Sequence, residues 1–262
     1  MQIFDNTMLI TGGTSGIGFE LARQLGALGN TVILTGRDRS KIDTARQKLP
    51  GCHMFQSDVS DPTAIARLHA EIIESFPELN VLINNAGIMR RVDLFAGAAD
   101  IKSLTDEVEI DLLGAIDMVV QFLPHLKAQK RAAIVNVSSG LAFVPLAAFP
   151  IYCAAKAAIH SFTQSLRIQL KDTRITVFEL APPITDTALV GPDSGTADVV
   201  RVKKMPVQTL VKSAIDGLRN DRLEIRPGLS NGLKIMSRVA PDFILKQLNR
   251  RTAQLPARFA RG

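Results

Sequence analysis

The chain has 262 residues, of which 46% are hydrophobic and 21% are charged. Disordered proteins contain few apolar residues and much unbalanced charge, so this composition predicts a folded protein, and the length fits one domain over 1–262. The formal net charge of +6 would by itself suit a nucleic-acid binder. Because the basic residues are scattered and form no runs, we expect no nucleic-acid partner and instead a small anionic ligand.

The sequence carries no sign of export or of a membrane span. Its two cysteines are too few for a disulfide framework. The first residues lack a basic region followed by an apolar signal core, and no run approaches about 18 uninterrupted apolar residues. We therefore expect a cytoplasmic protein with no transmembrane segment.

From the N-terminus onward, short apolar runs alternate with segments of helical periodicity. The expected strands are 7–11, 31–35, 53–58, 81–85, 132–139, 175–180 and 223–225, and the expected helices are 16–29, 38–49, 62–75, 104–127, 151–170 and 207–219. The strands are almost wholly apolar, as expected of strands buried on both faces. The order predicts an α/β fold in three layers, with a doubly wound, mainly parallel seven-stranded sheet and helices on both faces.

Two segments near the C-terminus differ from this alternation. Residues from about 185 to 205 are rich in glycine, proline, aspartate and lysine, and we interpret them as a mobile lid. Residues from about 230 to 262 form an amphipathic extension, which could cover a pocket, pack between subunits or lie on a membrane. Its apolar stripe is short for a membrane anchor, which favours the first two roles.

Residues 11–18 read T-G-G-T-S-G-I-G, and they follow an apolar strand and begin a helix. Glycine permits a tight turn and lets the backbone approach a pyrophosphate, which the free N–H groups at the positive end of a helix can bind. The alternative is a glycine-rich turn with no ligand. In an open parallel sheet, such a ligand lies beyond the carboxyl ends of the strands.

The spacing T-G-x-x-x-G-x-G resembles that of the short-chain dehydrogenase/reductase family, and three further motifs agree over about residues 5 to 190. N-N-A-G stands at 84–87, Ser139 precedes Tyr152 by thirteen residues and Lys156 follows Tyr152 by four, and A-P-P-I-T-D-T at 181–187 takes the place of the family's P-G-x-x-x-T. The resemblance implies a Rossmann fold and hydride transfer between a nicotinamide and a carbonyl or alcohol. The L-I-N-N-A-G-I and P-P-x-x-x-T runs also resemble a bacterial subgroup of oxidoreductases associated with D-alanyl-lipoteichoic acid genes.

On this resemblance, the expected cofactor-binding residues are Gly12, Thr14, Ser15, Gly16, Ile17, Gly18, Arg37, Asp58, Val59, Asn85, Ala86, Gly87, Tyr152, Lys156, Pro182, Ile184 and Thr187. Members that prefer NAD carry an acid at the end of the second strand, where this chain has Gly36. Arg37 follows with a fork of donors suited to a 2′-phosphate, so we expect NADP(H) as the cofactor and not NAD(H). Arg37 could instead only cap the helix start, although Asp38 is the expected cap.

The expected catalytic residues are Ser139, Tyr152, Lys156 and Asp111. Tyr152 and Lys156 lie four residues apart on one helix face, and Tyr152 is the chain's single tyrosine. To act as a base near neutral pH, its pKa would have to fall about three units from about 10. One nearby cation gives about one to three units. Reduction is therefore the preferred direction, with Tyr152 donating a proton while Ser139 hydrogen-bonds the same oxygen.

Two positions depart from the family pattern. Asp111 replaces the asparagine of N-x-x-G and could modify the proton relay through Lys156 or be only a helix-face residue. Pro183 replaces a glycine and should stiffen the start of the lid. Both motivate an alternative function, a catalytically weak nucleotide-sensing protein.

Three further expectations complete the sequence-based interpretation. The four histidines are widely spaced, without a zinc motif, so no metal is expected. The apolar run at 141–149 suggests a small, largely nonpolar substrate. The helices at 104–127 and 151–170 resemble those that pair subunits in the family, which implies a homodimer or homotetramer.

Overall fold

The computed structural model describes residues 1–94, 101–190 and 203–250, without the side chain of residue 103. Within them, seven parallel strands form one sheet in the order β3-β2-β1-β4-β5-β6-β7. The strands are β1 (Thr7–Ile10), β2 (Thr31–Gly36), β3 (His53–Gln56), β4 (Leu79–Asn84), β5 (Ala132–Val137), β6 (Ile175–Leu180) and β7 (Glu224–Ile225). The order reverses direction after β3, so that β1 and β4 lie side by side, as in a doubly wound sheet. The predicted fold class is confirmed.

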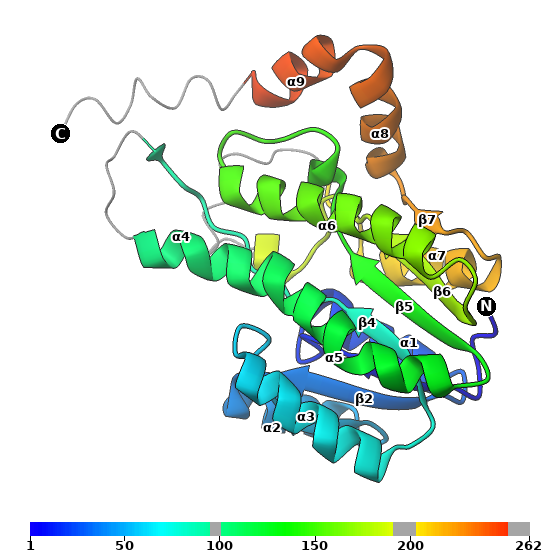
Figure 1. The fold of residues 1–262 in the computed structure, drawn as a ribbon. Coiled ribbons are helices and arrows are strands. Elements are labelled where there is room, and N and C mark those ends of the chain that lie inside the picture. Colours follow the sequence, from blue (N-terminus) through cyan, green and yellow to red (C-terminus); the bar gives the residue numbers. More distant parts are fainter. Residues whose placement is uncertain (95–100, 191–202, 251–262) are drawn as a thin grey trace.

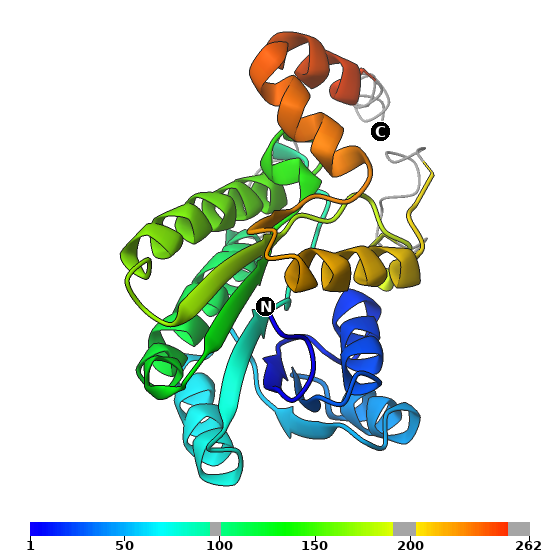
Figure 2. The same ribbon diagram turned by 90° about the vertical axis from the view of Figure 1, so that its right-hand side faces the viewer.

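Helices cover both faces of the sheet (Figures 1 and 2). They are α1 (Gly16–Gly26), α2 (Arg39–Lys48), α3 (Pro62–Ser75), α4 (Ile101–Val108), α5 (Gly114–Ala128), α6 (Pro150–Gln169), α7 (Val207–Arg219), α8 (Leu229–Val239) and α9 (Pro241–Asn249). Helices α1 and α7 enclose one apolar core against the sheet, and α3, α5 and α6 enclose the other. Every residue of the central strands β4 and β5 is buried, because both of their faces are covered.

The expected single helix over 104–127 is interrupted in the structure. Helix α4 ends at Val108, a π-helical turn spans Glu109–Leu113, and α5 begins at Gly114. A Cβ atom on Gly114 would lie 2.6 Å from the carbonyl oxygen of Val59, so the start of α5 packs tightly against the loop that contains Val59. A π turn holds an extra residue and changes which side chains face inward, and it is often found at functional sites.

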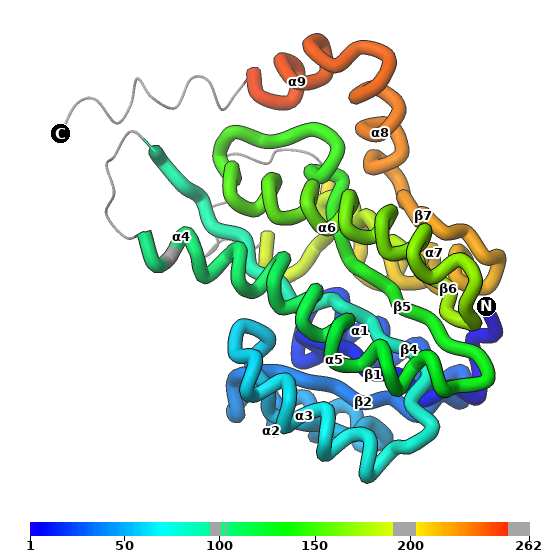
Figure 3. The backbone as a smooth tube through the Cα atoms, in the orientation of Figure 1, coloured from blue at the N-terminus to red at the C-terminus, as the bar shows by residue number. Residues whose placement is uncertain are grey.

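Beyond β7, the chain continues as two helices, α8 and α9, where one amphipathic segment was expected. They project past α6 from the body of the molecule (Figure 3). Helix α8 packs on the loop that follows β5, since a Cβ atom on Gly140 would lie 2.7 Å from Ser230 Oγ. The end of α9 is tied to the loop before α6, because the Ala147 N–H donates to Asn249 Oδ1 at 2.7 Å.

Part of the predicted lid and of the C-terminal extension, at 191–202 and 251–262, lies outside the described residues. The two described ends of the lid meet each other. The Met205 N–H donates to the Ile184 carbonyl at 2.9 Å, and the Asp186 N–H donates to the Met205 carbonyl at 2.9 Å. Among the described residues, no helix has the length and apolar character that a bilayer span requires.

Candidate active site

A cavity of about 650 Å³ lies at the carboxyl ends of the strands. Its walls come from the glycine loop, the ends of β2, β4 and β5, the loop after β6, and helices α6, α8 and α9. Among the predicted site residues, Gly18 and Asp111 are the two that do not line it. Motifs far apart in the sequence therefore meet at the sheet edge where parallel α/β folds bind their ligands.

The glycine loop is shaped by contacts that leave no room for side chains. Gly12 has a φ of +64°, and a Cβ atom there would lie 2.8 Å from the Ala86 Cα atom. Asn85 fastens the loop to the end of β4, because its Nδ2 donates to the carbonyls of Thr11 and Gly12 at 2.9 and 3.2 Å. Gly18 lies behind the loop, and a Cβ atom on it would lie 2.5 Å from Asn85 Nδ2. Among the described groups, no side chain caps the start of α1, so its first N–H groups remain suited to bind an anion.

The residues at the end of β2 leave little space for a side chain and carry positive charge. A Cβ atom on Gly36 would lie 2.7 Å from Thr14 Cγ2, so an acid cannot stand there unless Thr14 moves. Asp38 caps α2 as predicted, accepting from the N–H groups of Ser40 at 2.9 Å and Lys41 at 3.2 Å. Arg37 is exposed and lines the cavity. Lys41 also lines the cavity. It was not predicted from the sequence, because only the first residues after the strand were considered there.

Ser139, Tyr152 and Lys156 come together at the far end of the cavity, and all three side chains are buried. Ser139 follows β5, and its Oγ accepts a hydrogen bond from the Leu141 N–H at 3.1 Å. Tyr152 and Lys156 lie one turn apart on α6, with Lys156 Nζ 5.6 Å from the centroid of the Tyr152 ring. Lys156 Nζ also donates to the Val137 carbonyl at 3.3 Å, which directs the ammonium toward the end of β5.

The surroundings of Tyr152 favour its neutral form. Burial, followed by the negative charge of Asp111, raises the pKa of the Tyr152 phenol well above its usual range, while the hydrogen bond with Ser139 acts in the opposite direction. A phenol that keeps its proton near neutral pH is in the form that a general acid requires, while each rise in its pKa makes it a weaker acid. This agrees with the expectation that reduction is easier for this site than oxidation.

Asp111 lies on the π turn directly behind Lys156. Its side chain is 1% exposed, its Oδ2 lies 3.4 Å from Lys156 Nζ, and its Oδ1 accepts from the Ile88 N–H at 2.7 Å. Burial raises the pKa of this carboxyl, and the Lys156 charge opposes that rise. Gly87 makes the approach possible, because a Cβ atom there would lie 3.2 to 3.3 Å from Lys156 Nζ and both Asp111 oxygens. Of the two alternatives for Asp111, this contact with Lys156 favours a part in the relay.

Glu107 is a site residue that the sequence analysis missed. Its side chain is 0% exposed, although glutamate is rarely buried without a partner. One oxygen, Oε1, accepts from the Arg90 N–H at 3.2 Å, and Oε2 has no hydrogen-bond partner among the described residues. Burial, followed by the negative charge of Asp111, raises the pKa of Glu107 to about 7. The one sign in the sequence is that an acid stands four residues before Asp111. Two acids at this spacing are also common on the exposed face of an ordinary helix, so the spacing did not reveal that Glu107 is buried.

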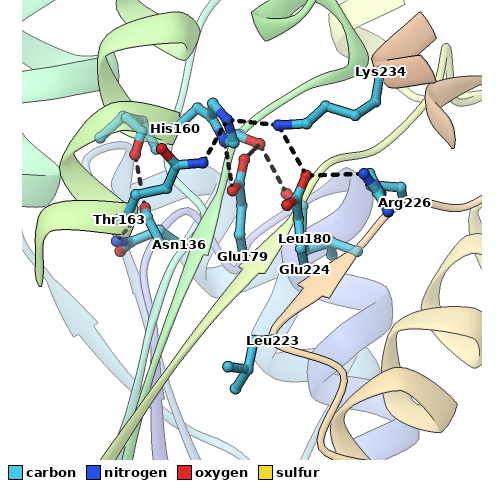
Figure 4. Close-up of polar contacts among 12 residues, drawn as sticks. Asn136, His160, Thr163, Glu179, Leu180, Leu223, Glu224, Arg226 and Lys234 are labelled. Atoms are coloured by element: carbon cyan, nitrogen blue, oxygen red, sulfur yellow. Dashed lines mark hydrogen bonds and ion pairs between the residues drawn. The ribbon is translucent and has the colours of Figure 1, made fainter. Parts of the chain in front are cut away.

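A second group of polar side chains lies one turn further along α6, and Figure 4 shows it; Glu179 and Lys234 are buried and the others are half-buried. We call it the tie cluster: His160 on α6, Glu179 on β6, Glu224 on β7, and Arg226 and Lys234 of the C-terminal region. Glu179 Oε2 lies 2.7 Å from His160 Nδ1, and His160 Nε2 lies 2.9 Å from Lys234 Nζ. Because an ammonium can only donate, His160 accepts through Nε2 and donates through Nδ1.

The tie cluster includes a possible ligand set for a metal, which the spacing of the histidines did not reveal. Atoms of His160, Glu179 and Glu224 lie within 4.8 Å of one another. Two tethered cations already occupy the Glu224 carboxylate, because Lys234 Nζ and an Arg226 nitrogen each lie 3.4 Å from Glu224 Oε1, and Lys234 also reaches the ring of His160. We therefore interpret the cluster as a structural connection between α8 and the sheet, and the absence of a metal stays a prediction.

Comparison with known proteins agrees with this geometry. The family model "short chain dehydrogenase" matches residues 6–197. The chain is 41% identical over 249 residues to the uncharacterized oxidoreductase DltE of Bacillus subtilis, covering 95% of this chain and 98% of that protein. Among solved structures, a short chain dehydrogenase from Burkholderia cenocepacia in complex with NADP has a TM-score of 0.82 at 24% identity, covering 95% of this chain and 99% of the other.

A short chain dehydrogenase/reductase from Burkholderia phymatum in complex with NAD has a TM-score of 0.78 at 23% identity, covering 89% of this chain and 94% of the other. At these identities, both solved structures support the fold alone. The family model and the relative from Bacillus subtilis carry the assignment further, since each covers most of the chain. The chain is a member of the short-chain dehydrogenase family and an NAD(P)-binding oxidoreductase.

Proposed function

We propose that the chain is an NADP(H)-dependent reductase of a small, largely nonpolar carbonyl compound, with Tyr152 as the general acid. The observation that carries this proposal is the placement of a buried, proton-holding Tyr152 beside Ser139 and Lys156 in the cavity that contains the glycine loop. General acid catalysis requires a group that holds its proton until the transition state and lies within reach of the reacting oxygen.

The residues around the cavity fit a dinucleotide. The glycine loop leaves the space that a pyrophosphate needs, because side chains at Gly12 and Gly16 are excluded by positive φ angles. The other residues expected to hold the cofactor are Thr14, Ser15, Ile17, Asp58, Val59, Ala86, Gly87, Pro182, Ile184 and Thr187, all of which line the cavity. When bound, a reduced nicotinamide supplies the hydride. The protein's own groups supply the proton and the orientation.

Three groups of the chain would handle the substrate oxygen. Ser139 Oγ accepts the Leu141 N–H, and its hydroxyl hydrogen, which bonds to Tyr152 in this structure, would donate to the oxygen of a carbonyl placed beside Tyr152. Tyr152 gives its phenolic proton to the same oxygen as negative charge develops there. The Lys156 ammonium then stabilises the phenolate left on Tyr152 until it is protonated again.

Turnover by the Tyr152→Phe variant tests this proposal directly. We expect loss of carbonyl reduction by about a hundredfold to ten-thousandfold, as is typical when a general acid is removed, with a far smaller change in affinity for NADPH. The measurement is NADPH oxidation across a panel of apolar aldehydes and ketones, with fluorescence titration of cofactor binding as the control. Equal turnover by the variant and the native chain would refute the role of Tyr152.

The shape and charge at the end of β2 support NADP(H) as the cofactor. Gly36 cannot be exchanged for an acid without moving Thr14, the Asp38 carboxylate is occupied as a helix cap, and Arg37 and Lys41 place two positive charges at the cavity wall. The 2′-phosphate of NADP(H) would lie next to these cations. The ribose 2′-hydroxyl of NAD(H) would lack the acidic side chain that accepts its hydrogen bond in NAD-binding folds.

Comparing NADPH and NADH in titrations at the same salt concentration tests the cofactor preference. We expect tighter binding of NADPH, and we expect Arg37→Ala to weaken NADPH by about tenfold or more while leaving NADH nearly unchanged. A matched control is Arg39→Ala, which removes an exposed arginine of α2 that does not line the cavity. Equal affinity of the native chain for NADPH and NADH would contradict the proposed preference for NADPH.

The substrate end of the cavity is apolar. Leu141, Leu146 and Phe149 from the segment before α6 line it together with Met236 and Leu248 from α8 and α9, and Leu248 packs against the cluster that contains Leu146 and Phe149. This agrees with the pocket-covering alternative for the C-terminal extension. Such walls favour a nonpolar substrate whose polar atoms are limited to the reacting carbonyl.

We also propose that the chain forms a homodimer or homotetramer through α5 and α6. Both helices expose large apolar side chains on their outer surfaces, Val120 at 64% and Ile168 at 70%. Exposed apolar surface on long helices is typical of subunit interfaces. Sedimentation of the native chain as a monomer would exclude this assembly.

A nucleotide-sensing protein is the second candidate function. The observation that favours it is Asp111, whose negative charge near Lys156 raises the pKa of Tyr152 and so opposes a catalytic phenolate. This candidate expects tight NADPH binding without turnover of any carbonyl or alcohol in the panel. The proposed reductase expects turnover that depends on Tyr152.

A further inference from the structure

Two buried acids, Glu107 and Asp111, lie close to one buried base, Lys156. All three side chains are buried, with exposed fractions of 0%, 1% and 4%. Among the described residues, Asp111 makes an ion pair with Lys156, although its Oδ2 has no hydrogen bond, whereas Glu107 has no ion pair and one backbone donor. A buried carboxylate without a counter-ion is costly and takes up a proton instead.

Both acids are bound to the same segment of backbone. The Ile88 N–H donates to Asp111 Oδ1 at 2.7 Å, and the Arg90 N–H, two residues further on, donates to Glu107 Oε1 at 3.2 Å. The two acids are also four residues apart along the stretch formed by α4 and the π turn, which places them on the same side. The two acids interact with each other and with the same lysine, so the first to ionise raises the pKa of the other.

We propose that Glu107 and Asp111 share a single proton beneath the catalytic centre, and that Glu107 carries it and acts as a positioning residue on Tyr152. This inference rests on the proposed role of Tyr152. With Glu107 protonated, Asp111 remains ionised as the counter-ion of Lys156, and the three groups together are neutral. When Glu107 loses its proton, an additional negative charge appears beside the pair.

The added charge changes the acidity of Tyr152. Asp111 and Glu107 both raise the pKa of the phenol through their negative charges. Ionised Glu107 therefore makes Tyr152 a weaker acid, and the proton leaves it less readily when negative charge develops on the substrate oxygen. The rate of reduction falls as the pH rises through the titration of Glu107, whose pKa burial raises to about 7. The proton released by Glu107 goes to solvent, and no bond to substrate changes.

The charged groups around Glu107 come from each element packed against α4. Helix α6 contributes Lys156, Tyr152 and Cys153, and the segment after β4 contributes Arg90, which pairs with Asp106 on α4 at 3.8 Å. Asp111 is the nearest acid on the π turn, and its charge raises the pKa of Glu107, whereas the Arg90 and Lys156 charges lower it. Burial is the largest influence and sets the direction of the shift.

Carbon-13 NMR of side-chain carboxyl groups tests the shared proton without any turnover. In the native chain labelled at glutamate, we expect one carboxyl signal to titrate near neutral pH, well above the ordinary value of 4.5, and to be missing from Glu107→Gln. In Asp111→Asn, the same signal should titrate at lower pH, because a negative neighbour has been removed. Titration of every glutamate in the ordinary acidic range would overturn the proposal, whether or not the protein turns over a substrate.

The pH profile of reduction gives the second test. Because one charge shifts a neighbour's pKa by about one unit, we expect the native rate to fall about threefold between about pH 6 and 8, and Glu107→Gln to lose this step while keeping the rate at low pH. The matched control is Glu109→Gln, two residues away and partly exposed, which should keep the native profile. A Glu107→Gln profile identical to the native one would contradict the inference, even if Tyr152 proves essential.

Discussion

Two charged groups that meet at α6 differ in charge balance. In the tie cluster, Glu179 and Glu224 lie near Lys234, Arg226 and the His160 ring. One turn earlier, Lys156 pairs with Asp111 and acts on Glu107, while Arg90, whose charge also acts on both acids, pairs with Asp106. Lys156 and His160 stand four residues apart on the same helix, so one turn of α6 contributes a group to each. Charge balance therefore distinguishes a structural network from a reactive one.

The difference follows from how burial treats charge. A buried acid with a charged partner and hydrogen bonds stays fixed, and the removal of one partner leaves an uncompensated charge that costs about 3 to 5 kcal/mol. A buried acid without a partner has already given up its charge near neutral pH, so its removal costs little. The same substitution should therefore cost much more stability in the tie cluster than at Glu107.

The largest expected effect is on folding stability when one acid of the tie cluster is neutralised. Glu179 accepts hydrogen bonds from Ser138 Oγ and His160 Nδ1 in a fully buried position. Glu179→Gln turns one of its oxygens into a donor, so we expect the free energy of unfolding to fall by about 3 kcal/mol. Glu107→Gln should change it by less than about 1 kcal/mol at pH 6. Denaturant unfolding of both variants measures the difference, and equal losses would break the comparison.

A second, smaller effect is the dependence of stability on pH. The folded state raises the pKa of Glu107 from 4.5 to about 7, so between these values the folded chain holds a proton that the unfolded chain has released. Stability from this group is present at low pH and is lost as pH rises toward neutrality, by at most about 1.4 kcal/mol per pH unit.

Glu107→Gln removes this contribution, because an amide does not titrate. The variant should match the native chain near pH 5 and become the more stable of the two by about 2 kcal/mol near pH 8. Denaturant midpoints measured at several pH values give the comparison, with Glu109→Gln as the control. A stability gap that does not change with pH would show that Glu107 is not a proton-holding group.

The smallest expected effect concerns Lys234, which ties α8 to α6 and β7. Its loss leaves Glu224 with Arg226 and leaves His160 Nε2 with Gln164 Nε2 at 3.1 Å, so neither of these groups is left without a partner and Lys234→Met should cost about 1 kcal/mol of stability, the worth of one hydrogen bond. Because Leu233 and Met236 of the same helix line the cavity, we expect KM for the carbonyl to rise about threefold to tenfold with little change in kcat.

Lys246→Met on the exposed side of α9 is the matched control for this variant. Steady-state kinetics with both variants separates the position of α8 from a general loss of positive charge. If the two variants raise KM equally, the tie cluster has no part in shaping the cavity. If Lys234→Met lowers kcat and leaves KM unchanged, the tie cluster affects the chemical step. It would then not be a purely structural network, and the proposed difference from Glu107 would be wrong.

Much of the frame was predictable because its signals are local. The bounds of α3, β6 and α7 agree with those expected from periodicity, and Asp38 caps α2 because the side chain reaches backbone groups two and three residues ahead. The glycine loop and the spacing of Tyr152 and Lys156 likewise depend on short-range geometry. The resemblance to a known family then implied the cofactor and the catalytic roles.

The rest depended on contacts between distant elements. Continuous helical periodicity over 104–127 concealed the π turn, and with it the burial of Glu107 and the contact of Asp111 with Lys156. The tie cluster draws on α6, β6, β7 and α8, which only the folded sheet brings together.

Periodicity and near-neighbour geometry are local, so the sequence alone indicated most of the strands and helices and the positions of the glycine loop and of the expected catalytic side chains along them. Which buried charges have partners was not visible in the sequence. That outcome depends on the packing of residues far apart in the chain, and at Glu107 and Asp111 packing left two acids with one lysine.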